Sequence, residues 1–164
     1  MRYYSFFIIY FFLILSACTG VDSQIKKSFK NTGNTIALKD LTSTSISDHR
    51  LSDAGSKIED ALEAKIARSA FIITQESPSY VLKYKVSNYD GGSRLKRFST
   101  FGLVKSGHGK LKVKVALYYE GKKVGAWIVD AWVKGGVLGG WTGSLFQRAA
   151  DEIMNHLRGK NSSF

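Results

Sequence analysis

The fold of this chain is decided by residues Lys110–Val133, KLKVKVALYYEGKKVGAWIVDAWV. The first half of this stretch alternates apolar and polar residues, which is typical of a strand with one buried face. Its apolar residues are Leu111, Val113, Val115, Leu117 and Tyr119, and its lysines are Lys110, Lys112 and Lys114. Either Glu120-Gly121 or Gly121-Lys122 can form a two-residue hairpin turn. The stretch therefore predicts two antiparallel strands joined by a tight turn.

The turn also predicts which side chains of the returning strand join the core. A two-residue turn of either kind places odd-numbered positions of one strand opposite even-numbered positions of the other. The residues expected on the apolar face are therefore Val124, Ala126, Ile128, Asp130 and Trp132, and those expected beside the lysines are Trp127, Val129, Ala131 and Val133. A carboxylate on the apolar face needs a partner, so we expect Asp130 to bond to backbone or to a lysine rather than to act in catalysis.

The expected lysine face is the strongest candidate for a binding surface. A row of strand lysines alone is typical of a solvated face, but an exposed row of Trp and Val residues beside it is unusual for plain solvent contact. We predict that Lys110, Lys112 and Lys114, with Trp127 beside them, contact an anionic surface such as anionic lipid or an envelope protein. Lys83 and Lys85 extend this face if their strand is adjacent.

Outside this hairpin, the patterns predict three further strands and two helices. The expected strands are Thr35–Thr42, Phe71–Ile73 (buried) and Tyr80–Val86, and the expected helices run from a cap at Ser52 or Asp53 to Ile66 and from a capping box at Ser144-x-x-Gln147 to Leu157. The glycine-rich stretches Tyr89–Gly109 and Gly135–Gly143 are expected to be connections. We predict an α+β fold, a mostly antiparallel sheet of about five strands with two helices on one face, in the order β-α-β-β-β-β-α.

The N-terminus carries a second informative pattern. An apolar run begins at Tyr3, after Arg2, and ends in Leu15-Ser16-Ala17-Cys18, which holds the only cysteine. The run is shorter than the about 20 residues of a bilayer-spanning helix and has the features of a secretory signal. Its end resembles the bacterial lipobox, which implies that Cys18 is lipidated and that residues 1–17 are removed. The non-acidic Thr19 favours the outer membrane, by resemblance to Gram-negative lipoproteins, and we expect the domain to face the periplasm.

This pattern sets the expected organisation of the chain. We predict a signal peptide at 1–17, a lipidated polar tether at 18–34, a single domain at 35–159 and a tail at 160–164. The formal net charge is +11, and such basic proteins usually bind nucleic acid. Export makes nucleic acid an unsuitable partner, so the membrane, anionic lipid or an envelope protein is expected instead. The sequence does not indicate an oligomeric state.

No pattern of catalytic or metal-binding residues stands out. The histidines His49, His108 and His156 are scattered and lack the spacing of a metal site. The glycine stretch Gly135–Gly140 lacks the Gly-Lys-Ser/Thr of a phosphate-binding loop. We therefore expect no metal, no cofactor and no catalytic residues, and predict a non-enzymatic binding or assembly module. The alternatives are an envelope hydrolase or an accessory subunit of a secretion apparatus.

The chain resembles an uncharacterised family of bacterial lipoproteins, the domain-of-unknown-function family numbered forty-four ten. The residues that carry the resemblance are Gly92-Ser93-Arg94, Gly107 with Gly109, Gly121-Lys122 and Gly139-Gly140. The resemblance covers most of residues 35–158 and implies an exported lipoprotein with a compact α/β domain. It implies no activity and no catalytic residues.

Overall fold

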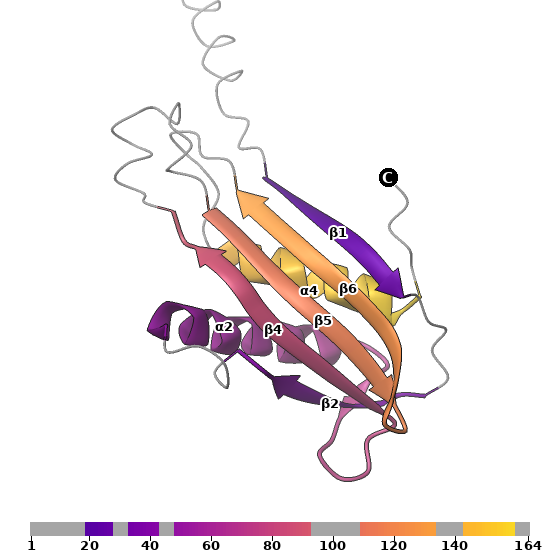
Figure 1. Cartoon of the computed structure of the whole chain (residues 1–164). Coiled ribbons are helices and arrows are strands. Elements are labelled where there is room, and N and C mark those ends of the chain that lie inside the picture. The colour runs from indigo at the N-terminus through magenta and orange to yellow at the C-terminus, as the bar shows by residue number, and fades with distance from the viewer. Residues whose placement is uncertain (1–18, 28–32, 43–47, 93–108, 134–142, 160–164) are drawn as a thin grey trace, which may run out of the picture.

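A six-stranded sheet with two helices on one face forms the described part of the chain (Figure 1). The computed structural model describes residues 19–27, 33–42, 48–92, 109–133 and 143–159. The elements are β1 (Thr19–Lys27), β2 (Thr35–Asp40), α2 (His49–Ile66), β3 (Ile72–Ile73), β4 (Tyr80–Asp90), β5 (Gly109–Tyr119), β6 (Lys122–Val133) and α4 (Gly143–Leu157). Neither helix of these ranges has the length and apolarity that crossing a bilayer would take.

The sheet is mixed, with the strand order β1-β6-β5-β4-β2-β3. The neighbouring pairs β1–β6, β6–β5 and β5–β4 are antiparallel, whereas β2 runs parallel to both β4 and β3. The α+β class is confirmed. The expected sheet of about five mostly antiparallel strands is corrected to a sheet of six strands, in which β2 pairs in parallel with β3 and β4. β2 and β3 can run parallel because α2 connects them as a crossover.

Both helices cover the same face of the sheet, as expected (Figure 1). α2 packs against β2, β3 and β4, α4 packs against β1, β5 and β6, and the two helices contact each other. The core between the layers includes Ile58 and Leu62 of α2, Ala149 and Ile153 of α4, and the inward residues of β4 and β5. The expected inward faces of Tyr80–Val86 and of Leu111–Leu117 are confirmed, because alternate residues of both strands are buried.

The helix starts differ from the sequence-based prediction. Asp48 caps α2, because its side chain accepts a hydrogen bond from the Arg50 backbone N–H. The predicted cap at Ser52 or Asp53 is therefore wrong, since both residues lie inside the helix. α4 begins at Gly143, and the buried Ser144 Oγ has no hydrogen-bond partner within the described residues. The expected capping box at Ser144 is therefore not formed.

One bulge changes the expected faces of the β5–β6 hairpin. The turn lies at Glu120-Gly121, both with positive φ (47° and 75°), and pairs Tyr119 with Lys122. Further along, Leu117 pairs with Gly125, so β6 holds one extra residue there. A bulge of this kind shifts every later residue to the other face. The odd-numbered residues of β6 from Trp127 onward are therefore in the core, and the predicted faces of this strand were wrong.

The predicted tether was also wrong in its first part, because Thr19–Lys27 is strand β1. It pairs with β6 from Thr19 opposite Val133 to Lys27 opposite Ala126, with one shift of register between Ile25 and Lys27. Val21 packs against the core, and the Lys27 ammonium donates a hydrogen bond of 2.6 Å to the Lys123 carbonyl. Residues 19–27 thus belong to the sheet of the domain, which was expected to start at residue 35.

The short strand β3 is a third correction. Phe71 is buried, but Ile72 and Ile73 are 57% and 36% exposed, so the predicted buried strand is instead a two-residue strand at the sheet edge. An edge strand has a neighbour on one side only, and β3 pairs only with β2. Such short edge strands limit unwanted pairing with other chains.

Candidate functional site

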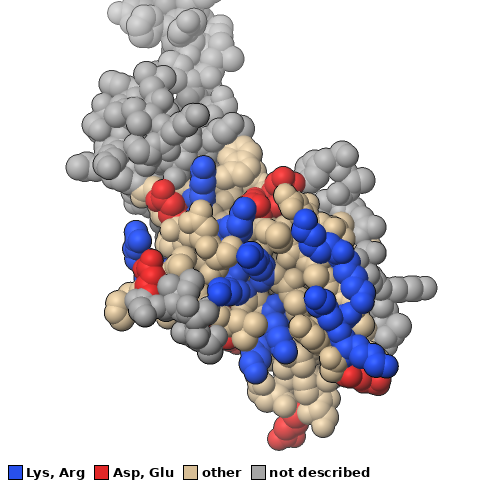
Figure 2. Space-filling view, viewed as in Figure 1, with Lys and Arg blue, Asp and Glu red and all other residues tan. Residues whose placement is uncertain are grey.

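The face of the sheet that the helices leave open carries a concentration of lysines (Figure 2). These lysines come from the alternate positions of three neighbouring strands whose other side chains face the core. They are Lys39 on β2, Lys83 and Lys85 on β4, and Lys110, Lys112 and Lys114 on β5. We call these six residues the basic face. Lys110, Lys112 and Lys114 lie on this side as predicted, and Lys83 and Lys85 join them because β4 is adjacent to β5.

Several lysines of the basic face lie directly opposite one another. Lys39 pairs in register with Lys83, and Lys85 pairs in register with Lys114. Side chains directly opposite on adjacent strands are about 5 Å apart at Cβ, and like charges there are destabilising. These pairs therefore do not contribute to the stability of the sheet, and an anion that bound between them would relieve their repulsion.

Among the described residues, few groups neutralise these charges. The Lys112 ammonium lies 3.3 Å from the Asp130 carboxylate, and the Lys83 ammonium lies 4.2 Å from the centre of the Tyr118 ring. Lys110 is opposite the exposed Asp90 in register. Lys39, Lys85 and Lys114 form no salt bridge within the described residues. The positive charge is therefore least compensated across β2, β4 and the middle of β5.

The structure corrects the predicted positions of Trp127 and Asp130, which exchange sides of the sheet. Trp127 is only 2% exposed and packs against the His156 ring, with ring centres 5.3 Å apart, so it is a core residue. Trp132 takes the outer position instead, opposite Lys110. Asp130 also lies on the outer side; its predicted lysine partner is confirmed and its predicted place on the apolar face is wrong. Cys18, His108 and Gly135–Gly140 lie outside the described residues.

A buried polar cluster joins β1 to α4, and the sequence alone did not reveal it. The Ser23 hydroxyl donates to Glu152 Oε1 at 2.7 Å and lies 2.9 Å from His156 Nε2, which is 3.2 Å from the same Glu152 oxygen. Glu152 and His156 are 4% and 6% exposed. A catalytic triad needs the hydroxyl and the carboxylate on different ring nitrogens. Here both contact Nε2, so the geometry suits a structural connection.

The buried histidine makes the stability of the protein depend on pH. Burial lowers the pKa of His156 below its ordinary 6.5, and Glu152 opposes this only in part. The unfolded chain thus takes up this proton more readily, so stability is lost as the pH falls below about 6.5. We expect the free energy of unfolding to decrease on acidification, and to decrease less in His156→Gln. Urea unfolding at a series of pH values measures this, and identical pH slopes would contradict it.

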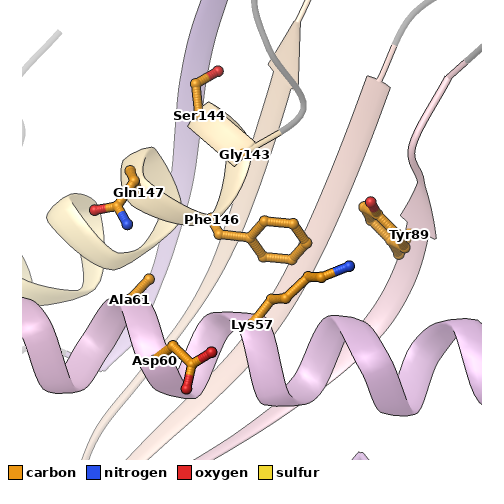
Figure 3. A pocket seen from close by; sticks show the side chains of 8 residues that line it. All are labelled: Lys57, Asp60, Ala61, Tyr89, Gly143, Ser144, Phe146 and Gln147. Atoms are coloured by element: carbon orange, nitrogen blue, oxygen red, sulfur yellow. The ribbon is translucent and has the colours of Figure 1, made fainter.

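A cleft of about 680 Å³ opens between the two helices at the start of α4 (Figure 3). Tyr89 and Phe146 form an aromatic wall, with ring centres 5.4 Å apart. Lys57 extends along this wall, and a hydrogen bond of 2.6 Å to Asp53 raises the pKa of its ammonium group. The remaining lining residues are Asp60, Ala61, Gly143, Ser144 and Gln147. The cleft offers an apolar surface beside one ammonium group and brings together none of the predicted site residues.

Comparisons with known proteins point to a family and to distant structural neighbours. A family model described as "Domain of unknown function (DUF4410)" matches residues 25–134. The match starts ten residues before the expected domain and confirms the predicted resemblance. No curated protein matches the chain.

Within the described ranges, no three side chains of metal-ligating type gather at one place.

The similar solved structures come from bacteria. The PelC dodecamer of Paraburkholderia phytofirmans is 15% identical over 88% of this chain and 100% of that chain, with a TM-score of 0.47. A PDZ domain protein of Parabacteroides distasonis is 10% identical over 89% of this chain and 38% of that chain, with a TM-score of 0.39. TolB of Acinetobacter baumannii is 13% identical over 85% and 32%, with a TM-score of 0.34. These likenesses are too distant to indicate a function.

Proposed function

This chain belongs to the DUF4410 family of domains of unknown function, and on that premise we propose that it is a lipid-anchored envelope protein whose basic face binds an anionic partner. The proposal is for a non-enzymatic binding or assembly module at the outer membrane. Its anchor is the lipid expected on Cys18. Its binding surface is the open side of the sheet, on the opposite side from both helices.

The observation that carries this proposal is the pairing of lysine with lysine across adjacent strands. Lys39 with Lys83, and Lys85 with Lys114, stand opposite each other on an open face. Such an arrangement costs stability, and anion binding offsets that cost. Proteins use fields of one sign to attract partners of the other sign. An anionic partner is therefore the class of ligand that this face fits best.

The anchor supports the same proposal from the sequence. The Leu15-Ser16-Ala17-Cys18 pattern places the lipid immediately before β1, and stable anchoring requires more than one acyl chain. Bacterial lipoproteins of the type that this pattern resembles carry three. Export also removes the basic face from contact with nucleic acid and leaves lipid headgroups and acidic envelope proteins as partners.

The least compensated lysines provide the test. We expect the triple variant Lys39→Gln, Lys85→Gln, Lys114→Gln to bind anionic vesicles about a hundredfold more weakly at low salt, because each lysine near an anionic surface contributes about 1 kcal/mol. The measurement is co-sedimentation of the non-lipidated chain from Thr19 onward with vesicles that contain phosphatidylglycerol. The fold is expected to survive, since these side chains lie outside the core.

A charge-matched control distinguishes the effect of the basic face on vesicle binding from the effect of the net charge of the protein. Lys57, Arg68 and Arg158 are exposed and belong to the helical side of the molecule or to the ends of its helices. The variant Lys57→Gln, Arg68→Gln, Arg158→Gln also removes three positive charges and is expected to keep most of the binding. The proposed role of the basic face would be contradicted if both triple variants weakened binding equally. It would also be contradicted if binding did not depend on lipid charge and salt concentration.

A further inference from the structure

One end of the sheet is tied by its register to the start of β1. Thr19 pairs with Val133, and Val133 pairs with Gly109, so the beginning of β1, the end of β6 and the beginning of β5 form one row (Figure 1). β4 also ends there, with Asp90 opposite Lys110. We call this row and the row next to it the anchor end of the sheet.

The anchor end adjoins the expected lipid attachment site with no spacer. Cys18 immediately precedes Thr19, and consecutive Cα atoms are about 3.8 Å apart. A flexible tether of the predicted length would have allowed the domain to move about 20–25 Å from the membrane. Because β1 instead pairs with β6 from Thr19 onward, the residue that follows the expected lipid site is already part of the sheet.

The second row of the anchor end carries a Trp and a Lys side by side. Gly20 pairs with Trp132, and Trp132 pairs with Lys110, all on the open face of the sheet. The Trp132 indole lies across Gly20, where a Cβ atom would collide with its six-membered ring. Tryptophan is enriched at the boundary between membrane and water, and lysine places its stem along apolar surface with its charge in water.

We propose that Trp132 and Lys110 rest in the headgroup region of the membrane that holds the Cys18 lipid. This inference rests on the lipid anchor of the proposed function. Along the strand axis these residues lie only two positions from Cys18, which is about 7 Å. The headgroup region of one leaflet is about 5–8 Å deep. A lipid on Cys18 thus brings this Trp–Lys pair to the interface, even where the sheet stands upright on the membrane.

Depth-dependent quenching of tryptophan fluorescence tests the inference. The protein is the full lipidated chain with Trp141→Phe, reconstituted in vesicles that contain lipid brominated near the headgroup. Trp127 is buried in the core and serves as the shielded internal reference. We expect the brominated lipid to quench a distinct part of the emission, and Trp132→Phe to remove most of that quenchable part. Quenching that is unchanged by Trp132→Phe would overturn the inference.

A reporter at the far end of the sheet provides the matched control. Lys122 is exposed at the hairpin, ten positions from Trp132 along β6. In the Trp132→Phe, Trp141→Phe background, Lys122→Trp is expected to be quenched several-fold less than Trp132. Equal quenching at the two positions would also overturn the inference, because the anchor end would then have no preferred contact.

The lipid is measured separately by palmitate labelling of the same preparations. A chain that carries no lipid contradicts the anchor in the proposed function. A chain that is lipidated and bound to vesicles, but whose Trp132 is no more quenched than Trp127, contradicts the Trp132–Lys110 contact alone.

Discussion

Replacing Trp127 with alanine is expected to lower the free energy of unfolding by about 3–5 kcal/mol, the usual range for a large aromatic residue removed from a core. Trp127 is 2% exposed, and its ring centre lies 5.3 Å from that of His156 in α4. The substitution therefore leaves a cavity beside the Ser23–Glu152–His156 cluster. It also removes the apolar cover of these buried polar groups, which makes water entry easier.

Urea unfolding of Trp127→Ala and Trp132→Ala in parallel measures this difference. Both residues are tryptophans of β6, five positions apart, but Trp132 lies on the open face and is only partly buried. We expect Trp132→Ala to cost less than half as much as Trp127→Ala. A larger loss at Trp132 than at Trp127 would mean that β6 has no bulge at Val124 and that simple alternation describes the strand.

Replacing Cys18 with serine is expected to abolish palmitate incorporation and to move the protein from the membrane fraction to the soluble fraction. The thiol is the atom that lipidation of this motif modifies, and serine has no sulfur to accept the lipid. Cys18 is the only cysteine in the chain, so no other thiol can replace it. The loss is therefore expected to be close to complete, larger than any effect of the lysine variants on membrane association.

Labelled palmitate followed by separation of membranes from soluble protein gives both measurements. Ser16→Ala is the control, since it keeps a small residue next to the cleavage site and is expected to label fully. Equal labelling of Cys18→Ser and of the unaltered chain would show that Cys18 is not the lipid site. The basic face would then need a different explanation for its access to membranes or envelope proteins.

The prediction from sequence succeeded where a pattern is local. Alternation along Tyr80–Val86 and Leu111–Leu117 predicts which side chains are buried, and helical spacing predicts α2 and the stripe of α4 that contains Ala149 and Ile153. The lysines of β5 belong to the same alternation, so their place on the open face followed directly. The two-residue turn was among the predicted alternatives because Gly121 adopts positive φ at little cost.

The tertiary structure alone decided the rest. The bulge at Val124 adds one residue to β6, and since side chains alternate with period two, that single residue exchanges Trp127 and Trp132 between core and surface. No local pattern predicts such an insertion. The pairing of β1 with β6 and the contact of Ser23 with Glu152, 129 residues apart, likewise depend on segments that meet only in the folded chain. The sequence by itself thus determined the strands of the central sheet and the lysine row, whereas long-range pairing determined where the domain begins and which tryptophan faces outward.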